Sequence, residues 1–230
     1  MRKQDAYKKR CWWQMILLAL SLLLYSCTRD AYEKGEGKYS LMRADFAEAF
    51  VNSNKQVTSI VTDDGDELAL TTPYKAKWVS KADTTYRCYL YYNKVEGKAE
   101  VLSMAKVTCP TILLPAGLSK GLITDPVKFE SMWLSKTGKY LNLSLYVKTG
   151  EADDSSATQK LDIIQDKLIV HPDNKCIRHL ILFHDQSNIP EYYSRQVYIS
   201  VPTNKIDADS VGISINTYDN GEIIVKRRCR

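Results

Sequence analysis

The sequence predicts an all-β protein, with a small closed barrel followed by a β-sandwich. Three observations support this fold class. Apolar and polar residues alternate along most of the chain after its first forty residues, which is the period of a half-buried strand. Turn-forming pairs such as Asp64-Gly65, Glu96-Gly97 and Asn220-Gly221 separate the alternating segments. A segment rich in Pro and Gly then divides the chain into two parts.

The first part contains two predicted hairpins. The first joins Val57–Thr62 to Glu67–Thr71 through a turn that contains Asp64-Gly65, and the second joins Tyr86–Val95 to Ala99–Thr108. Leu41–Phe50 is ambiguous, because its composition suits a helix while its large apolar residues could also lie on one side of an irregular strand. About five short strands in this part would be enough to close a small barrel.

The second part begins after the segment that contains Pro110, Pro115 and Pro126. We therefore expect a barrel domain over 40–112 and a sandwich domain over 122–228. Strands are expected at these places: Val127–Trp133, Leu141–Val147, Ile177–Phe183, Val197–Val201, Val211–Thr217 and Ile223–Val225. Ile177–Phe183 is apolar on both faces, as in a central strand. Several short strands at this spacing predict a β-sandwich.

The N-terminus has the pattern of an export signal. A basic start precedes a Leu-rich stretch, Trp12–Leu24, which is short for a membrane span, and Leu24-Tyr25-Ser26-Cys27 follows directly. This resembles the lipobox of bacterial lipoproteins, although Tyr25 is bulky for its position. The resemblance implies a signal peptide over 1–26 and lipidation (palmitate) at Cys27, which would attach the protein to the cell envelope, at the outer membrane. An uncleaved signal anchor is the alternative. Residues 27–39 then form a polar tether.

Most of the net positive charge of the chain lies within this signal. Of its 32 Lys and Arg residues, five lie within residues 1–26, as does one of its 27 Asp and Glu residues, so 27 basic and 26 acidic residues remain from residue 27 onward. A nearly neutral protein lacks the electrostatic footprint that nucleic-acid binding requires. We therefore expect no nucleic-acid partner.

Four cysteines remain after Cys27, namely Cys88, Cys109, Cys176 and Cys229. An envelope compartment permits disulfides, and four cysteines allow three pairings, among which the sequence does not choose. Pairing within each half and free thiols both stay open.

The ordered set of motifs resembles NigD-like lipoproteins of Bacteroides-type bacteria. The resemblance rests on the lipobox and on Thr62-Asp63-Asp64-Gly65, Tyr86–Tyr92, Asp125-Pro126-Val127 with Trp133, and Tyr140–Leu143. It implies an N-terminal OB-like barrel and a C-terminal β-sandwich, and so a strand at Leu41–Phe50. The family implies no established chemistry, and its link to a bacteriocin operon hints at an immunity role.

Enzyme-like motifs lack the context that their chemistry needs. Gly117–Gly121 satisfies G-x-S-x-G, but no strand-turn-helix context surrounds it. Ser103 and Lys106 would point to opposite faces of a strand, as would His179 and His184. A calcium site at Asp63–Glu67 would offer few ligands, and a solvated turn explains the same residues. We expect no catalytic residue, metal or cofactor, with a periplasmic hydrolase as the alternative.

The strongest binding candidate is a strand face formed by Arg87, Tyr89 and Tyr91, with Trp78 nearby. If Cys88, Leu90 and Tyr92 point into the barrel, these side chains point outward, where aromatic rings can stack on a ligand. In the alternative, the tyrosines pack against a loop or the second domain. The sequence thus predicts a lipid-anchored envelope protein with a non-catalytic binding or protective role, whose partner is a protein or a glycan.

Overall fold

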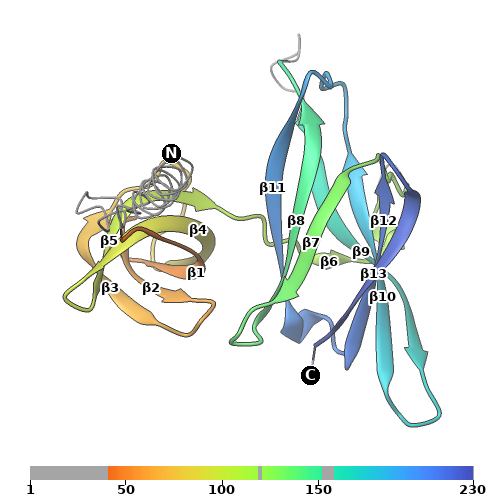
Figure 1. Ribbon diagram of the computed structural model, residues 1–230, viewed down its shortest axis with the longest axis horizontal. Helices are drawn as coiled ribbons and strands as arrows, with labels where there is room; N and C mark the ends of the chain where they lie inside the picture. The colour runs from red at the N-terminus through yellow and green to blue at the C-terminus, as the bar shows by residue number, and fades with distance from the viewer. Residues whose placement is uncertain (1–40, 119–120, 152–157, 230) are drawn as a thin grey trace, which may run out of the picture. The chain divides into compact units, whose positions relative to one another are not determined.

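The computed structural model describes residues 41–118, 121–151 and 158–229, and Met42–Arg230 form one compact unit. Strands dominate the described chain, and its two helical segments, η1 (Pro115–Gly117) and η2 (Thr203–Lys205), are single 3₁₀ turns (Figure 1). The all-β prediction is therefore confirmed. Among the described residues, no helix has the length and apolar character needed to span a membrane.

Five strands close into the N-terminal barrel in the order β1-β2-β3-β5-β4, which confirms the OB-like architecture (Figure 1). They are β1 (Arg43–Val51), β2 (Val57–Thr62), β3 (Glu67–Tyr74), β4 (Thr84–Val95) and β5 (Lys98–Lys106). The pairs β2–β3 and β4–β5 are the two predicted antiparallel hairpins. The barrel closes through the antiparallel β1–β4 pair and a short parallel contact of β3 with β5 at Leu70 and Ala99.

The ambiguous segment Leu41–Phe50 contributes strand β1. Ala47, Ala49 and Val51 are buried in the barrel core, while Phe46, Glu48 and Phe50 alternate with them and point outward. The small alanines let β1 curve tightly around that core, so their helical propensity is overridden by packing. The core also contains Cys88, Leu90 and Tyr92 of β4, as the alternation of that strand predicts.

Two sheets form the second domain. The larger has the order β13-β12-β10-β9-β6 and the smaller the order β11-β8-β7. The strands are β6 (Ile112–Leu113), β7 (Lys128–Leu134), β8 (Tyr140–Thr149), β9 (Lys160–Val170), β10 (Cys176–Asp185), β11 (Tyr193–Pro202), β12 (Ser210–Thr217) and β13 (Gly221–Arg228). Strand β10 is central in its sheet, as its two apolar faces indicate.

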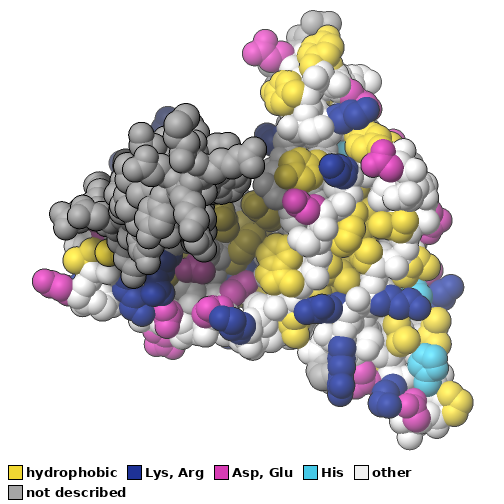
Figure 2. Space-filling model, in the orientation of Figure 1, with side chains coloured by type: hydrophobic (Ala, Val, Ile, Leu, Met, Phe, Trp, Pro, Cys, Tyr) yellow, Lys and Arg dark blue, Asp and Glu magenta, His cyan; other side chains and the backbone are white. Residues whose placement is uncertain are grey.

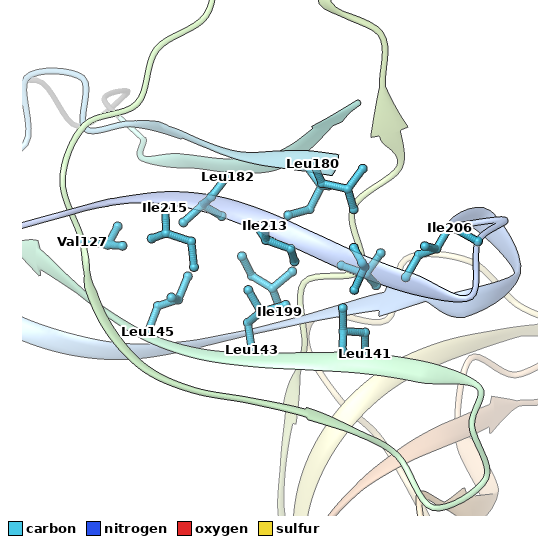
Figure 3. Close-up of a cluster of buried hydrophobic side chains, with 14 of the residues drawn as sticks. Val127, Leu141, Leu143, Leu145, Leu180, Leu182, Ile199, Ile206, Ile213 and Ile215 are labelled. Atoms are coloured by element: carbon cyan, nitrogen blue, oxygen red, sulfur yellow. The ribbon is translucent and has the colours of Figure 1, made fainter. Parts of the chain in front are cut away.

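The sandwich core lies between these sheets, as Figure 3 shows. Leu141, Leu143 and Leu145 of β8 face Ile213 and Ile215 of β12, and all five side chains are fully buried (Figure 3). Completely burying an aliphatic side chain contributes about 1.5–3 kcal/mol. This layer therefore stabilises the domain chiefly through the hydrophobic effect.

Two features of the second domain differ from the sequence prediction. Strand β9 was not predicted, because polar residues interrupt its apolar run at Gln165-Asp166-Lys167. Strand β6 was not predicted either: Ile112–Leu113 pair in parallel with Ile163–Ile164 of β9. The Pro- and Gly-rich segment interrupts the alternation of apolar residues, so the two-residue strand β6 could not be predicted from the sequence pattern.

Candidate functional site: the outward face of β1 and β4

The outward face of β1 and β4 contains a ladder of cross-strand pairs, three of which form the candidate site. Phe46 lies opposite Tyr89, Glu48 opposite Arg87, and Phe50 opposite Thr85. Because side chains alternate along a strand, these residues all point away from the barrel core. The Phe46–Tyr89 pair belongs to an aromatic layer and the Glu48–Arg87 pair to an ionic layer. The Phe50–Thr85 pair borders an open cleft.

The aromatic layer joins the barrel to the sandwich. The ring centre of Phe46 lies 4.8 Å from that of Tyr89, 5.5 Å from that of Trp133 on β7 and 5.1 Å from that of Tyr198 on β11. Tyr89 is also 5.4 Å from Tyr198. These separations fall in the range of stabilising aromatic pairs. Burial, followed by the neighbouring hydroxyl of Tyr91, raises the pKa of Tyr89 to about 12.

The ionic layer is centred on Arg87, whose side chain is only 2% exposed. Its Nη2 lies 2.7 Å from Asp63 Oδ2 and donates to Asn142 Oδ1 at 3.2 Å, while Nε donates to Ser200 Oγ at 3.1 Å. The guanidinium carbon lies 4.0 Å from the ring centre of Tyr140. A barrel arginine is therefore held by three residues of the sandwich.

The partners of Arg87 also bind one another. Asn142 Nδ2 donates to Asp63 Oδ2 at 2.8 Å, and Ser200 Oγ donates to Asn142 Oδ1 at 2.6 Å. Asn142 and Ser200 are fully buried. Arg87 Nη1 has no hydrogen-bond partner among the described residues. The other polar groups of the network satisfy one another, so the network specifies how the two domains fit together.

Glu48 forms the second half of the ionic layer. Tyr140 Oη donates to Glu48 Oε1 at 2.8 Å, and Lys139 Nζ lies 3.0 Å from Oε2. Burial alone would raise the pKa of the Glu48 carboxyl, but the hydrogen bonds from Tyr140 and Lys139 hold it below its ordinary value. The carboxylate is thus stabilised in its charged form rather than prepared to accept a proton.

Beyond the ionic layer the ladder opens into a cleft of about 700 Å³. Its walls come from β1, β4, the end of β5, the connection to the sandwich, β8 and β9, through residues Glu48, Phe50, Thr85, Tyr86, Arg87, Lys106, Val107, Thr108, Cys109, Pro110, Thr111, Tyr140 and Asp162. The volume is within the range of ligand pockets.

The thiol of the cleft is not activated as a nucleophile. Burial raises the pKa of the Cys109 thiol, and burial also raises the pKa of Asp162. A catalytic cysteine is activated by a lowered pKa, so Cys109 lacks that activation although its side chain is exposed. The Tyr86 hydroxyl accepts hydrogen bonds from the amides of Ser80 and Lys81, which fix the ring at the cleft wall.

The four residues singled out from the sequence have different environments. Arg87 and Tyr89 lie in the contact with the sandwich, and Tyr91 lies at its margin with 38% exposure. Trp78 is separate from them: it packs against the barrel core and donates from Nε1 to the Met104 carbonyl at 3.3 Å. The cleft itself was missed, because it joins segments that are distant in sequence.

The acidic turn between β2 and β3 is neutralised by cations. Asp63 pairs with Arg87, Asp64 with Lys136 at 2.6 Å, and Asp66 with Lys94 at 3.2 Å. Within the described residues, no group of three or more His, Cys, Asp or Glu side chains is placed to hold a metal ion. These ion pairs explain the cluster of carboxylates as a structural feature of the turn.

The other motifs are placed as follows. His184 is fully buried at the end of β10, where Nδ1 lies 3.0 Å from the Asp125 carbonyl. Ser119 of the G-x-S-x-G string lies outside the described residues, as do residues 1–40 with Cys27. Cys88 and Cys109 carry free thiols, and so does Cys176, so a bridge within either half is not formed.

A closed barrel joined through a buried ionic layer to a β-sandwich defines a two-domain, all-β protein. Residues 112–227 match the family model of the NigD-like C-terminal beta sandwich domain, which covers half of the chain, and the protein belongs to this family. The expected family and fold are thereby confirmed. A comparison with curated proteins gives no match.

Solved structures share this fold at low sequence identity. A NigD-like immunity protein from Bacteroides caccae is 22% identical, with a TM-score of 0.62 over 80% of this chain and 91% of that one. A protein of unknown function from Bacteroides vulgatus is 18% identical, with a TM-score of 0.58 over 81% and 90%. A candidate lipoprotein from Bacteroides fragilis is 13% identical, with a TM-score of 0.57 over 82% and 98%.

Proposed function

We propose that this protein is a lipid-anchored envelope protein with a non-catalytic binding or protective role. Cys27 carries the lipid and attaches the chain to the outer membrane. The polar tether, Thr28–Lys38, separates the folded domains from the lipid surface by at most ~35 Å at about 3.3 Å per residue. The folded part then presents its surface to a partner in the envelope.

The non-catalytic role is supported by one observation: the charged side chains of the site are paired with other residues of the protein. Arg87 is taken up by Asp63, Asn142 and Ser200, and Glu48 by Lys139 and Tyr140. A catalytic acid or base needs a pKa near the operating pH and access to its substrate. A cysteine hydrolase would require the cleft's thiol to be activated, and the raised pKa of Cys109 favours the binding role instead.

The envelope location is supported by two kinds of observation. The N-terminal pattern of basic, apolar and small residues ends at Cys27. The Bacteroides proteins of similar fold include one described as a candidate lipoprotein. The similar structure from Bacteroides caccae is described as an immunity protein, and protection against a bacteriocin is the corresponding form of the protective role here.

The experiment that tests the proposal compares the full-length protein with Cys27→Ala in a Bacteroides host. Cells are grown with an alkyne-tagged fatty acid, and the outer membrane is separated from soluble fractions. The wild-type protein is expected to carry the tag and to sediment with the outer membrane. Cys27→Ala is expected to lose the tag, whereas the matched variant Cys109→Ala keeps it. Acyl labelling that persists in Cys27→Ala would overturn the anchor.

A further inference from the structure

The cleft beyond the ionic layer has an aromatic side. Phe50 is 37% exposed and lines the cleft from the outward face, and Tyr86 lines it from the neighbouring strand, where its ring packs against the edge of the barrel core. The Tyr86 ring is fixed at its hydroxyl by Ser80 and Lys81 and along its edge by Trp78, with 5.5 Å between ring centres. A ring that is already held in place loses little conformational entropy when a ligand packs against it.

The lining of the cleft is also rich in hydroxyls and hydrogen-bond acceptors. Thr85, Thr108 and Thr111 are exposed there, and the carboxylates of Glu48 and Asp162 lie on the same lining. Threonine hydroxyls both donate and accept, while ionised carboxylates accept only. The cleft therefore offers many acceptors to a ligand that carries many hydroxyl donors.

The charges of the lining balance. Two carboxylates, Glu48 and Asp162, face two cations, Arg87 and Lys106, and Arg87 is already paired with Asp63. Among the described residues Asp162 has no ion-pair partner, and the Lys106 ammonium lies 5.8 Å from the Tyr86 ring centre. Such a balance gives no net attraction to a polyanion or a polycation, so a neutral ligand is favoured.

We infer that this cleft binds a neutral oligosaccharide, in which the apolar C–H face of one sugar unit packs on Phe50 and another unit contacts Tyr86, while the hydroxyls reach the threonines and carboxylates. This inference rests on the proposed binding role and names the class of its partner. The site shares Arg87 with the Arg87–Tyr89–Tyr91 face but differs from it, because neither Tyr89 nor Tyr91 lines the cleft. It also adds to the barrel a ligand site that is completed by β8 and β9 of the sandwich.

Titration of the full-length protein in mild detergent tests the inference. Maltohexaose, cellohexaose and xylohexaose serve as neutral probes, trigalacturonate as an acidic probe and hexaglycine as a peptide probe, with binding followed by calorimetry and saturation-transfer NMR. Saturable binding to at least one neutral hexasaccharide, with weaker or absent binding of the other two probes, is expected. The glycan assignment is overturned if the protein prefers the acidic or the peptide probe, or if none of the neutral probes binds.

Three variants locate the binding. Phe50→Ala removes the exposed ring and is expected to raise Kd at least about ten-fold, as for other aromatic anchors, without lowering the melting temperature. Thr111→Trp fills the cleft and is expected to abolish binding. Tyr192→Ala removes an exposed ring of the sandwich that does not line the cleft, and its Kd should match wild type. Equal losses in Phe50→Ala and Tyr192→Ala would refute the site. None of these outcomes alters the acylation test of the anchor, so the two proposals fail independently.

Discussion

Arg87 on β4 and Asp63 in the β2–β3 turn form an ion pair, with 2.7 Å between Nη2 and Oδ2. The arginine is almost entirely excluded from solvent, and the same carboxylate oxygen accepts a hydrogen bond from Asn142 of the sandwich. A charge in this environment is stable only while its partners remain. The pair therefore links the integrity of the barrel to the presence of the second domain.

Removing the arginine tests this dependence. Arg87→Ala leaves Asp63 without its cation, and we expect unfolding to become easier by about 3–5 kcal/mol, as when one partner of a buried pair is lost. Lys136→Ala is the control, because its pair with Asp64 is more than half exposed on both sides and should contribute about 1 kcal/mol or less. Urea denaturation of both variants provides the measurement. Equal, small effects would contradict a structural role for Arg87.

The tyrosine face gives a second test. Tyr89→Ala removes a ring that contacts Phe46 and Tyr198, and we expect a loss of roughly 3–5 kcal/mol. Tyr91→Ala removes a ring that lies at the margin and is partly exposed, so its cost should be clearly smaller. Thermal unfolding followed by circular dichroism compares them. A melting temperature for Tyr89→Ala that equals wild type would show that the ring is not part of a packed interface.

Glu48 predicts a pH dependence. Its carboxyl has a lowered pKa in the folded protein, so its interactions stabilise the fold above the ordinary value of 4.5 and are lost as the pH falls through the lowered folded value. Glu48→Gln should therefore be less stable than wild type at neutral pH and approach it in strong acid. Urea unfolding at pH 7 and pH 3 measures both differences. A difference of the same size at the two pH values would exclude a charge-based contribution.

The thiols are predicted to differ in reactivity. Burial raises the pKa of Cys88 to about 12 and encloses its sulfur, whereas Cys109 is exposed in the cleft. In native, unreduced protein, N-ethylmaleimide should label Cys109 and spare Cys88, which should react only after denaturation. Peptide mass spectrometry locates the label. Labelling of Cys109 that appears only after reduction would instead indicate a disulfide.

Local patterns predicted the strands whose alternation and turns are continuous. Asp64-Gly65 and Glu96-Gly97 lie in the turns that join the two barrel hairpins, with positive φ at Gly65, Glu96 and Gly97. Strand β9 escaped prediction because Gln165–Lys167 interrupt it, and pairing with β10 compensates for that weak local signal. The periodicity of a sequence does not show which strands will pair with one another.

The candidate site was only partly predictable for a similar reason. Alternation along β4 correctly placed Arg87, Tyr89 and Tyr91 on the outward face, but it could not show that Asn142 and Ser200 cover Arg87. Those partners lie 55 and 113 residues further along the chain. The cleft at Phe50 likewise depends on β8 and β9, so its existence follows from tertiary packing rather than from any motif.

The central claim is that the barrel and the sandwich are coupled through the buried polar network around Arg87. A double-mutant cycle of Arg87→Ala and Asn142→Ala tests it most directly, because the two side chains belong to different domains and share a 3.2 Å hydrogen bond. Urea unfolding of wild type, both single variants and the double variant should give a coupling free energy of about 0.5–3 kcal/mol. Additive effects, with a coupling free energy that does not differ from zero, would contradict the claim.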